Sequence, residues 1–212
     1  MQARIRFTVS RPGADRIHHV TEEDVRVVLG RLPVALYQRL RAVHFNDHGF
    51  ARRFGYVTRG NREIVLCALP PRMSLRRALI KGQTPEEFGA RTGEKWPPLA
   101  MRRFLLYDVF LHELGHLQMV DAARSSRLKF AREKLAHEFA TEWRNRLWSE
   151  PFEHADPVHD PPSAEELTAL NLVRTAPNGQ GRETARLRRK SQGFTATEES
   201  VTSEFPKREH RS

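Results

Sequence analysis

The chain of 212 residues contains one cysteine, Cys67. A single thiol can form neither an intramolecular disulfide nor a cysteine-rich zinc site. No stretch approaches the roughly 20 apolar residues that a membrane span requires, and residues 1–10 lack the sustained apolar run of a secretory signal. We therefore expect a cytoplasmic protein without a membrane partner. Cys67 lies within an apolar run, which predicts a buried, structural thiol.

Aromatic residues are scarce, at 8% of the chain, and none interleave with a basic run as a base-stacking platform would require. Positive charge is nevertheless abundant, with a net charge of +10. It belongs to residues 1–150, which hold 27 Lys and Arg against 16 Asp and Glu, whereas residues 151–212 hold 9 against 10. Such a surface could attract nucleic acid or acidic substrates, or it could simply be solvated.

The most informative segment is His112-Glu113-Leu114-Gly115-His116. On a helix, histidines four positions apart project from one face, where they can bind one Zn²⁺, and the glutamate between them can take a proton from zinc-activated water. Residues 101–111 are strongly apolar helix formers, so the motif is expected on a buried helix over 98–120. Gly115 costs a helix interior about 1 kcal/mol relative to Ala, which suggests that another element packs too closely for a side chain.

The pattern predicts an α+β fold in which a small sheet is followed by two long helices. Local capping, turn and periodicity signals define the expected elements. These are helices over 21–32, 34–40, 84–90, 98–120, 127–148 and 163–174, a strand beginning at 42, and a β-hairpin over 54–69. We expect one domain over 1–150, with its core over about 25–150, and a linker and largely disordered tail over 151–212. In the second long helix, the apolar positions expected in the core are Leu128, Leu135, Phe139, Trp143 and Leu147.

A catalytic zinc site normally has three protein ligands, so a third residue must join the two histidines. If the two long helices form an antiparallel hairpin with its turn within 121–126, positions 132–134 lie opposite the motif. Glu133 is the carboxylate found there. His137 would lie one turn further along and could orient a ligand. A shift of the turn by two residues would instead favour His137 or Glu138 as the ligand, so this geometry leaves three candidates.

The motif, together with the Glu133-x-x-Ala136-x-x-Phe139-Ala140 pattern, resembles the gluzincin-type HExxH zinc metallopeptidases, most closely the ImmA/IrrE-like group. The resemblance covers residues 25–150. It implies a zincin-like core, a minimal metallopeptidase fold, and it implies that Glu133 is the third zinc ligand. The chain departs from the group at His137, where the group usually has Asn or Asp.

These observations predict a zinc-dependent metallopeptidase with Zn²⁺ bound by His112, His116 and Glu133, and with Glu113 as general base. A protein or peptide substrate could bind as an added strand along the exposed edge of the 54–69 hairpin. Two alternatives are a DNA-associated, SprT-like protease and a non-enzymatic binding module that retains the zincin fold. An intact Glu113 argues against the binding module. The candidates for a group that stabilises the oxyanion are His154, His159, Tyr56 and Tyr107.

Overall fold

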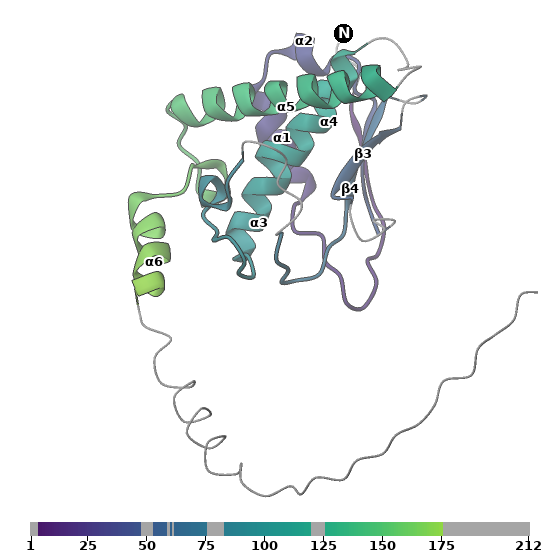
Figure 1. The fold of residues 1–212 in the computed structure, drawn as a ribbon. Coiled ribbons are helices and arrows are strands. Elements are labelled where there is room, and N and C mark those ends of the chain that lie inside the picture. The colour runs from purple at the N-terminus through teal and green to yellow at the C-terminus, as the bar shows by residue number, and fades with distance from the viewer. Residues whose placement is uncertain are drawn as a thin grey trace, which may run out of the picture. The chain divides into compact units, whose positions relative to one another are not determined.

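The computed structural model describes residues 4–47, 53–58, 60, 62–75, 83–119 and 126–175, and these form an α+β fold, as the sequence predicts (Figure 1). The strands are β1 (Arg6–Val9), β2 (Ala42–Asn46), β3 (Gly55–Thr58) and β4 (Glu63–Cys67). The α-helices are α1 (Glu22–Arg31), α2 (Val34–Tyr37), α3 (Pro98–Phe104), α4 (Leu111–Gln118), α5 (Ser126–Ser149) and α6 (Ala164–Thr175). Leu105–Phe110 is a π-helical segment, and Pro85–Phe88 and Pro157–His159 are 3₁₀ turns.

The four strands form one mixed sheet in the order β1-β2-β4-β3. β1 and β2 are parallel, β2 and β4 are parallel, and β4 is antiparallel to β3. The β3–β4 pair confirms the hairpin expected over 54–69. β1, which the sequence analysis did not predict, lies at one edge with mostly exposed residues. β3 lies at the other edge, so its outer backbone groups face no further strand of the described sheet.

α1 begins where the sequence predicts, because Thr21 and Asp24 form a reciprocal cap. The Asp24 backbone N–H donates to Thr21 Oγ1 at 3.2 Å, and the Thr21 N–H donates to the Asp24 carboxylate at 2.8 Å. The same carboxylate accepts a hydrogen bond from the Arg102 guanidinium at 2.9 Å. This cap therefore also fixes α1 against α3.

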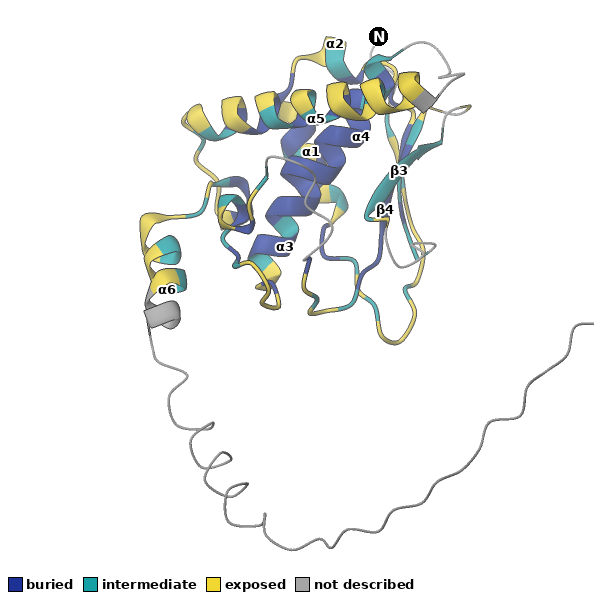
Figure 2. Ribbon diagram, viewed as in Figure 1, coloured by how far each residue is buried: buried dark blue, intermediate teal, exposed yellow. Residues whose placement is uncertain are grey.

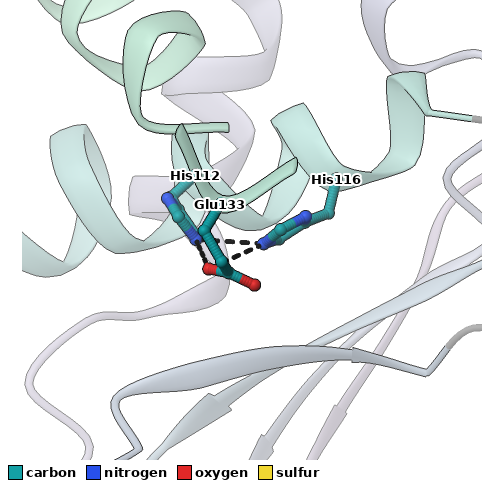
Figure 3. Close-up of side chains that lie close together, drawn as sticks. All are labelled: His112, His116 and Glu133. Carbon is teal, nitrogen blue, oxygen red and sulfur yellow. Dashed lines mark hydrogen bonds and ion pairs between the residues drawn. The ribbon is translucent and has the colours of Figure 1, made fainter. Parts of the chain in front are cut away.

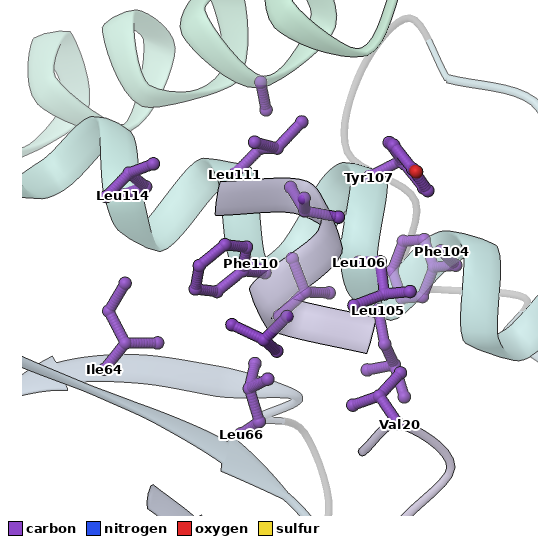
Figure 4. Close-up of a cluster of buried hydrophobic side chains, with 14 of the residues drawn as sticks. Val20, Ile64, Leu66, Phe104, Leu105, Leu106, Tyr107, Phe110, Leu111 and Leu114 are labelled. Carbon is purple, nitrogen blue, oxygen red and sulfur yellow. The ribbon is translucent and has the colours of Figure 1, made fainter. Parts of the chain in front are cut away.

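The helix carrying the motif is continuous from Pro98 to Gln118, through α3, the π-helical segment and α4. Nearly every residue along it is buried, which confirms the buried helix expected there (Figure 2). Phe110 and Leu114 face Ile64 and Leu66 of β4, so the helix lies directly on the sheet (Figure 4). The wider π turn ends immediately before α4, and such segments occur frequently at functional sites.

α5 buries part of the stripe that the sequence analysis predicted. Trp143 and Leu147 are in the core as expected, and Phe139 packs against it. Leu128 and Leu135 were predicted in the core, and this is wrong, because they are 51% and 53% exposed. The buried face instead contains Ala136 and Ala140. Leu135 lies about 100° around the helix from Ala136, which turns it towards solvent.

The chain after α5 packs back onto the first helices. Val158 and His159 are buried, and a 2.9 Å hydrogen bond joins the His159 ring to the Tyr107 hydroxyl. Arg103 pairs with Glu166 at 2.9 Å. These contacts belong to a compact unit that extends to Val173. A second unit comprises Arg174–Ser212. The expected disordered tail beyond residue 176 lies outside the described residues, and so do residues 121–125 of the turn expected within 121–126.

Cys67 is buried at the end of β4, which confirms the expectation of a buried thiol. Burial raises the pKa of this thiol to about 11, so it stays protonated and unreactive at neutral pH. Among the helices of the described residues, none is long and apolar enough to cross a membrane.

Candidate metal centre

Three side chains from two helices converge on one point, as Figure 3 shows. His112 and His116 project from α4, and Glu133 reaches them from α5. Glu133 Oε2 lies 3.3 Å from His112 Nε2 and 3.5 Å from His116 Nε2. The two Nε2 atoms are 3.0 Å apart. The structure therefore brings together the three residues that the sequence analysis named as zinc ligands.

These separations fit a tetrahedral zinc ion. Zinc bonds to imidazole nitrogen and carboxylate oxygen are about 2.0–2.2 Å long, so two ligand atoms of a tetrahedral site lie about 3.3–3.5 Å apart. The three observed separations, 3.0, 3.3 and 3.5 Å, are close to that edge length. Two imidazoles and one carboxylate are also a donor set that catalytic zinc uses, with the fourth position left for water. The residues present thus fit the metal that the motif implies.

The electrostatics of the site keep His112 ready to act as a ligand. Burial, and then the neighbouring His116 and His137, lower the pKa of His112 to about 3. The imidazole is therefore neutral throughout the physiological range, and a neutral ring nitrogen is the form that binds a metal. Glu133 is the exposed member, with 56% of its side chain accessible.

Gly115 explains how α5 comes near enough for Glu133 to reach the histidines. A Cβ atom at Gly115 would lie 3.1 Å from Phe139 Cδ1 and 3.2 Å from the Ala136 Cα atom. Both are closer than ordinary van der Waals contact. The close packing inferred from the sequence is therefore confirmed, and the packing element is α5.

Glu113 lines the same cleft as the three candidate ligands. Its carboxylate accepts a hydrogen bond from the Val57 N–H of β3. Burial, and then the charge of Glu133, raise the pKa of Glu113 to about 8. β3 can approach the helix because Gly55 has no side chain. A Cβ there would lie 2.9 Å from Val109 Cγ1 and 3.5 Å from Glu113 Cγ.

The other two ligand candidates take different positions. Glu138 is exposed and pairs with Lys134 at 3.5 Å, so it is not part of the cluster. The His137 ring lies against His112, with 4.6 Å between the ring centroids. His112 Nδ1 and His137 Nε2 are both buried and without a hydrogen-bond partner among the described residues. The role of His137 in orienting His112 stays a prediction.

The cleft has a volume of about 680 Å³, within the range of small-molecule and peptide sites. Of the four candidates for stabilising an oxyanion, Tyr56 lines it. Tyr107 and His159 are bonded to each other, and the His154 ring packs on His159 with 4.6 Å between centroids. None of these three is among the residues that line the cleft.

The sequence analysis did not single out several other residues that line the cleft. The neutral ones are Gly55, Val57, Leu117 and Met119, and the cationic ones are Arg39, Arg53, Arg62, Lys129 and Arg132. A glycine at the start of a predicted edge strand is a weak signal of a close backbone approach, and it could have identified Gly55. The cations come from four separate parts of the chain, and no spacing in the sequence groups them.

Comparison with known proteins identifies no relative: no protein-family model, no curated protein and no solved structure matches this chain.

Proposed function

We propose that this protein is a zinc-dependent metallopeptidase with a zincin-like core. The observation that carries the proposal is the arrangement of His112, His116 and Glu133 at the mutual separations of tetrahedral zinc ligands, with the buried carboxyl group of Glu113 beside them. His112, His116 and Glu133 would hold the metal. When bound, zinc lowers the pKa of a water molecule and polarises a carbonyl oxygen.

Glu113 carries the proton transfers. Its carboxylate takes a proton from the attacking water, and the carboxylic acid so formed delivers that proton to the amine nitrogen that leaves. Burial moves the pKa of this group towards neutrality, and a base whose pKa lies near the working pH can both accept and return a proton. The Val57 N–H holds the carboxyl group against β3, which keeps it at the cleft wall.

The outer edge of β3 offers a place for the substrate backbone. β3 lies at the edge of the sheet, and Gly55, Tyr56 and Val57 line the cleft beside Glu113. A peptide in extended conformation could add to this edge by main-chain hydrogen bonds. Its scissile carbonyl would then lie beside the candidate metal ligands. Tyr56 of β3 carries a phenolic hydroxyl group and lines the cleft, so it is our candidate for stabilising the oxyanion.

The deciding experiment compares the wild type with Glu113→Gln, and uses Glu138→Gln as a matched control on an exposed carboxylate outside the cluster. We expect about one zinc per chain in all three proteins by elemental analysis. We expect cleavage of peptides from a proteome digest by the wild type and the control, and none by Glu113→Gln. A wild type that binds no zinc would overturn the proposal. Zinc in all three with no cleavage would favour a non-enzymatic binding module.

A further inference from the structure

Basic side chains outnumber acidic ones along the cleft, and we call the five basic ones the rim cations. Two carboxylates, Glu113 and Glu133, line the cleft together with a larger set of basic side chains. These are Arg39, Arg53, Arg62, Lys129 and Arg132. Positive charge thus surrounds a site whose two carboxylates are assigned to the metal and to proton transfer.

The charge of Arg53 acts on Glu113 at longer range, but among the described residues no acid lies close enough to neutralise these cations. None of the five forms an ion pair with any residue in the described ranges. Some arginines elsewhere in the fold are matched with acids, as in the pairs of Arg102 with Asp156 at 2.6 Å and of Arg144 with Glu87 at 2.8 Å. Uncompensated charge around a concave site raises the local concentration of ligands of opposite sign.

Two of these cations flank β3 along the chain, and two others lie on α5. Arg53 lies two residues before β3, and Arg62 lies at the turn that follows it. The backbone of Arg62 is held at both polar groups, because its N–H donates to the Thr58 carbonyl at 3.1 Å and its carbonyl accepts from the Arg41 N–H at 2.9 Å. Lys129 and Arg132 come from α5, the element that supplies Glu133. A peptide along β3 would therefore lie between cations at the strand ends and cations of the helix.

We infer that this cleft selects acidic peptide segments, with Asp or Glu on both sides of the scissile bond. The inference rests on the proposed peptidase function and adds the substrate class. A strand edge offers alternating N–H donors and carbonyl acceptors, which a peptide backbone complements along its length, whereas a nucleic-acid backbone has no N–H donors for the carbonyls. Among the described residues that line the cleft, Tyr56 is the one Phe, Tyr or Trp, whereas single-stranded nucleic acid is bound by several stacking rings.

The test measures binding without hydrolysis, in the full-length, zinc-loaded Glu113→Gln protein. Three fluorescein-labelled peptides of one length are compared by fluorescence anisotropy: one with several Glu residues, one with Gln in their place and one with Lys. We expect the Glu peptide to bind at least about tenfold more tightly than the Gln peptide, since several exposed charge pairs each contribute a few-fold. The advantage should shrink as ionic strength rises, because exposed charges are screened.

A pair of double variants tests whether the rim carries the preference. Arg53→Glu with Arg132→Glu changes two rim cations, and Arg53→Gln with Arg132→Gln is the milder version. The control is Arg11→Glu with Arg72→Glu, which changes the net charge equally at exposed positions outside the cleft. Zinc content and thermal melts establish that each variant is folded. We expect the rim variants to lose the preference for the Glu peptide and the control to keep it.

The outcomes separate this inference from the proposed function. Equal affinity for the three peptides, or a preference that survives in both rim variants, would overturn the acidic-substrate inference and leave the zinc site and Glu113 intact. A single-stranded oligonucleotide that binds more tightly than the Glu peptide would also overturn it, in favour of a nucleic-acid partner. Absence of zinc from the wild type would instead remove the peptidase proposal.

Discussion

At the scale of single residues, the candidate metal centre combines two restrained candidate ligands with one exposed candidate ligand. His112 and His116 are held by a buried helix, so their rings lose little further freedom when a metal binds. Glu133 lies on the exposed side of the cluster, with 56% of its side chain accessible. The geometry of the site therefore depends on where α5 places the Glu133 backbone.

The first prediction concerns this carboxylate. Glu133→Ala removes the proposed oxygen ligand, and we expect zinc affinity to fall by at least about 100-fold, since even residues that only support a ligand contribute 10- to 100-fold. Glu138→Ala is the matched control, because Glu138 is an exposed glutamate of the same helix whose carboxylate pairs with Lys134. Competition with a chromophoric chelator measures both affinities. Equal losses in the two variants would mean that Glu133 is not a ligand.

The sequence carries different amounts of information about the residues of the site. The spacing of His112 and His116 is local, so helix geometry alone places them on one face. To identify Glu133 as the third candidate ligand, we had to assume a helical hairpin, and that assumption left His137 and Glu138 as alternative ligands. Gly55 and the rim cations are brought to the cleft by tertiary structure, and for these the sequence offers almost nothing.

At the scale of elements, the decisive contact is the crossing of α4 and α5. Ala136 and Ala140 are fully buried on the face of α5, opposite Gly115 of α4. Small residues on both helices let the backbones approach closely. That approach explains why leucines of the first half of α5 lie outside the core. α5 therefore buries its small residues Ala136 and Ala140 and leaves the larger Leu128 and Leu135 exposed to solvent.

Two helix glycines give a matched test of this packing. Gly115→Ala gains helix propensity worth about 1 kcal/mol, but its Cβ would press on Phe139 and Ala136. Overpacking costs about 1–3 kcal/mol, so we expect a net loss of about 1 kcal/mol of unfolding free energy. A Cβ at Gly30 of α1 would meet nothing within 4 Å, so we expect Gly30→Ala to gain up to about 1 kcal/mol. Urea unfolding with a chelator present measures both. A stabilised Gly115→Ala would show that the helices can separate freely.

Elements with local signals were predicted well. The Thr21 cap, the hairpin turn and the apolar run before the motif lie within a few residues of the structure they specify. β1 was missed because its stabilising partner is not local: Arg6 pairs with Ala42 in a parallel ladder. Parallel pairing leaves no turn signal between the strands, and an exposed edge strand leaves little hydrophobic pattern.

At the scale of the whole molecule, residues 156–159, which follow α5 and which we call the closing segment, pack against the earlier helices. Arg102 of α3 binds Asp24 at 2.9 Å and Asp156 at 2.6 Å, and so links the start of α1 to the closing segment. His159 belongs to the same closing segment, and its buried ring lies beside Tyr107 of the π-helical segment. Global stability should therefore respond to the charge of a histidine that lies outside the metal cluster.

The last prediction follows from that histidine. Burial, and then the nearby His154, lower the pKa of His159 to about 4, from 6.5 in an unfolded chain. Between these values the unfolded chain binds a proton at this position and the folded chain does not, so protonation favours unfolding. The stabilising contribution is complete above pH 6.5 and is lost as the pH falls towards 4. His159→Asn does not titrate and retains an acceptor for the Tyr107 hydroxyl. We expect the stability advantage of the wild type over this variant to shrink by on the order of 2 kcal/mol between pH 7 and pH 4. Urea unfolding in chelator across this range measures the difference, with His18→Asn as the control. An advantage that stays constant with pH would show that His159 is protonated in the folded protein as readily as in the unfolded chain.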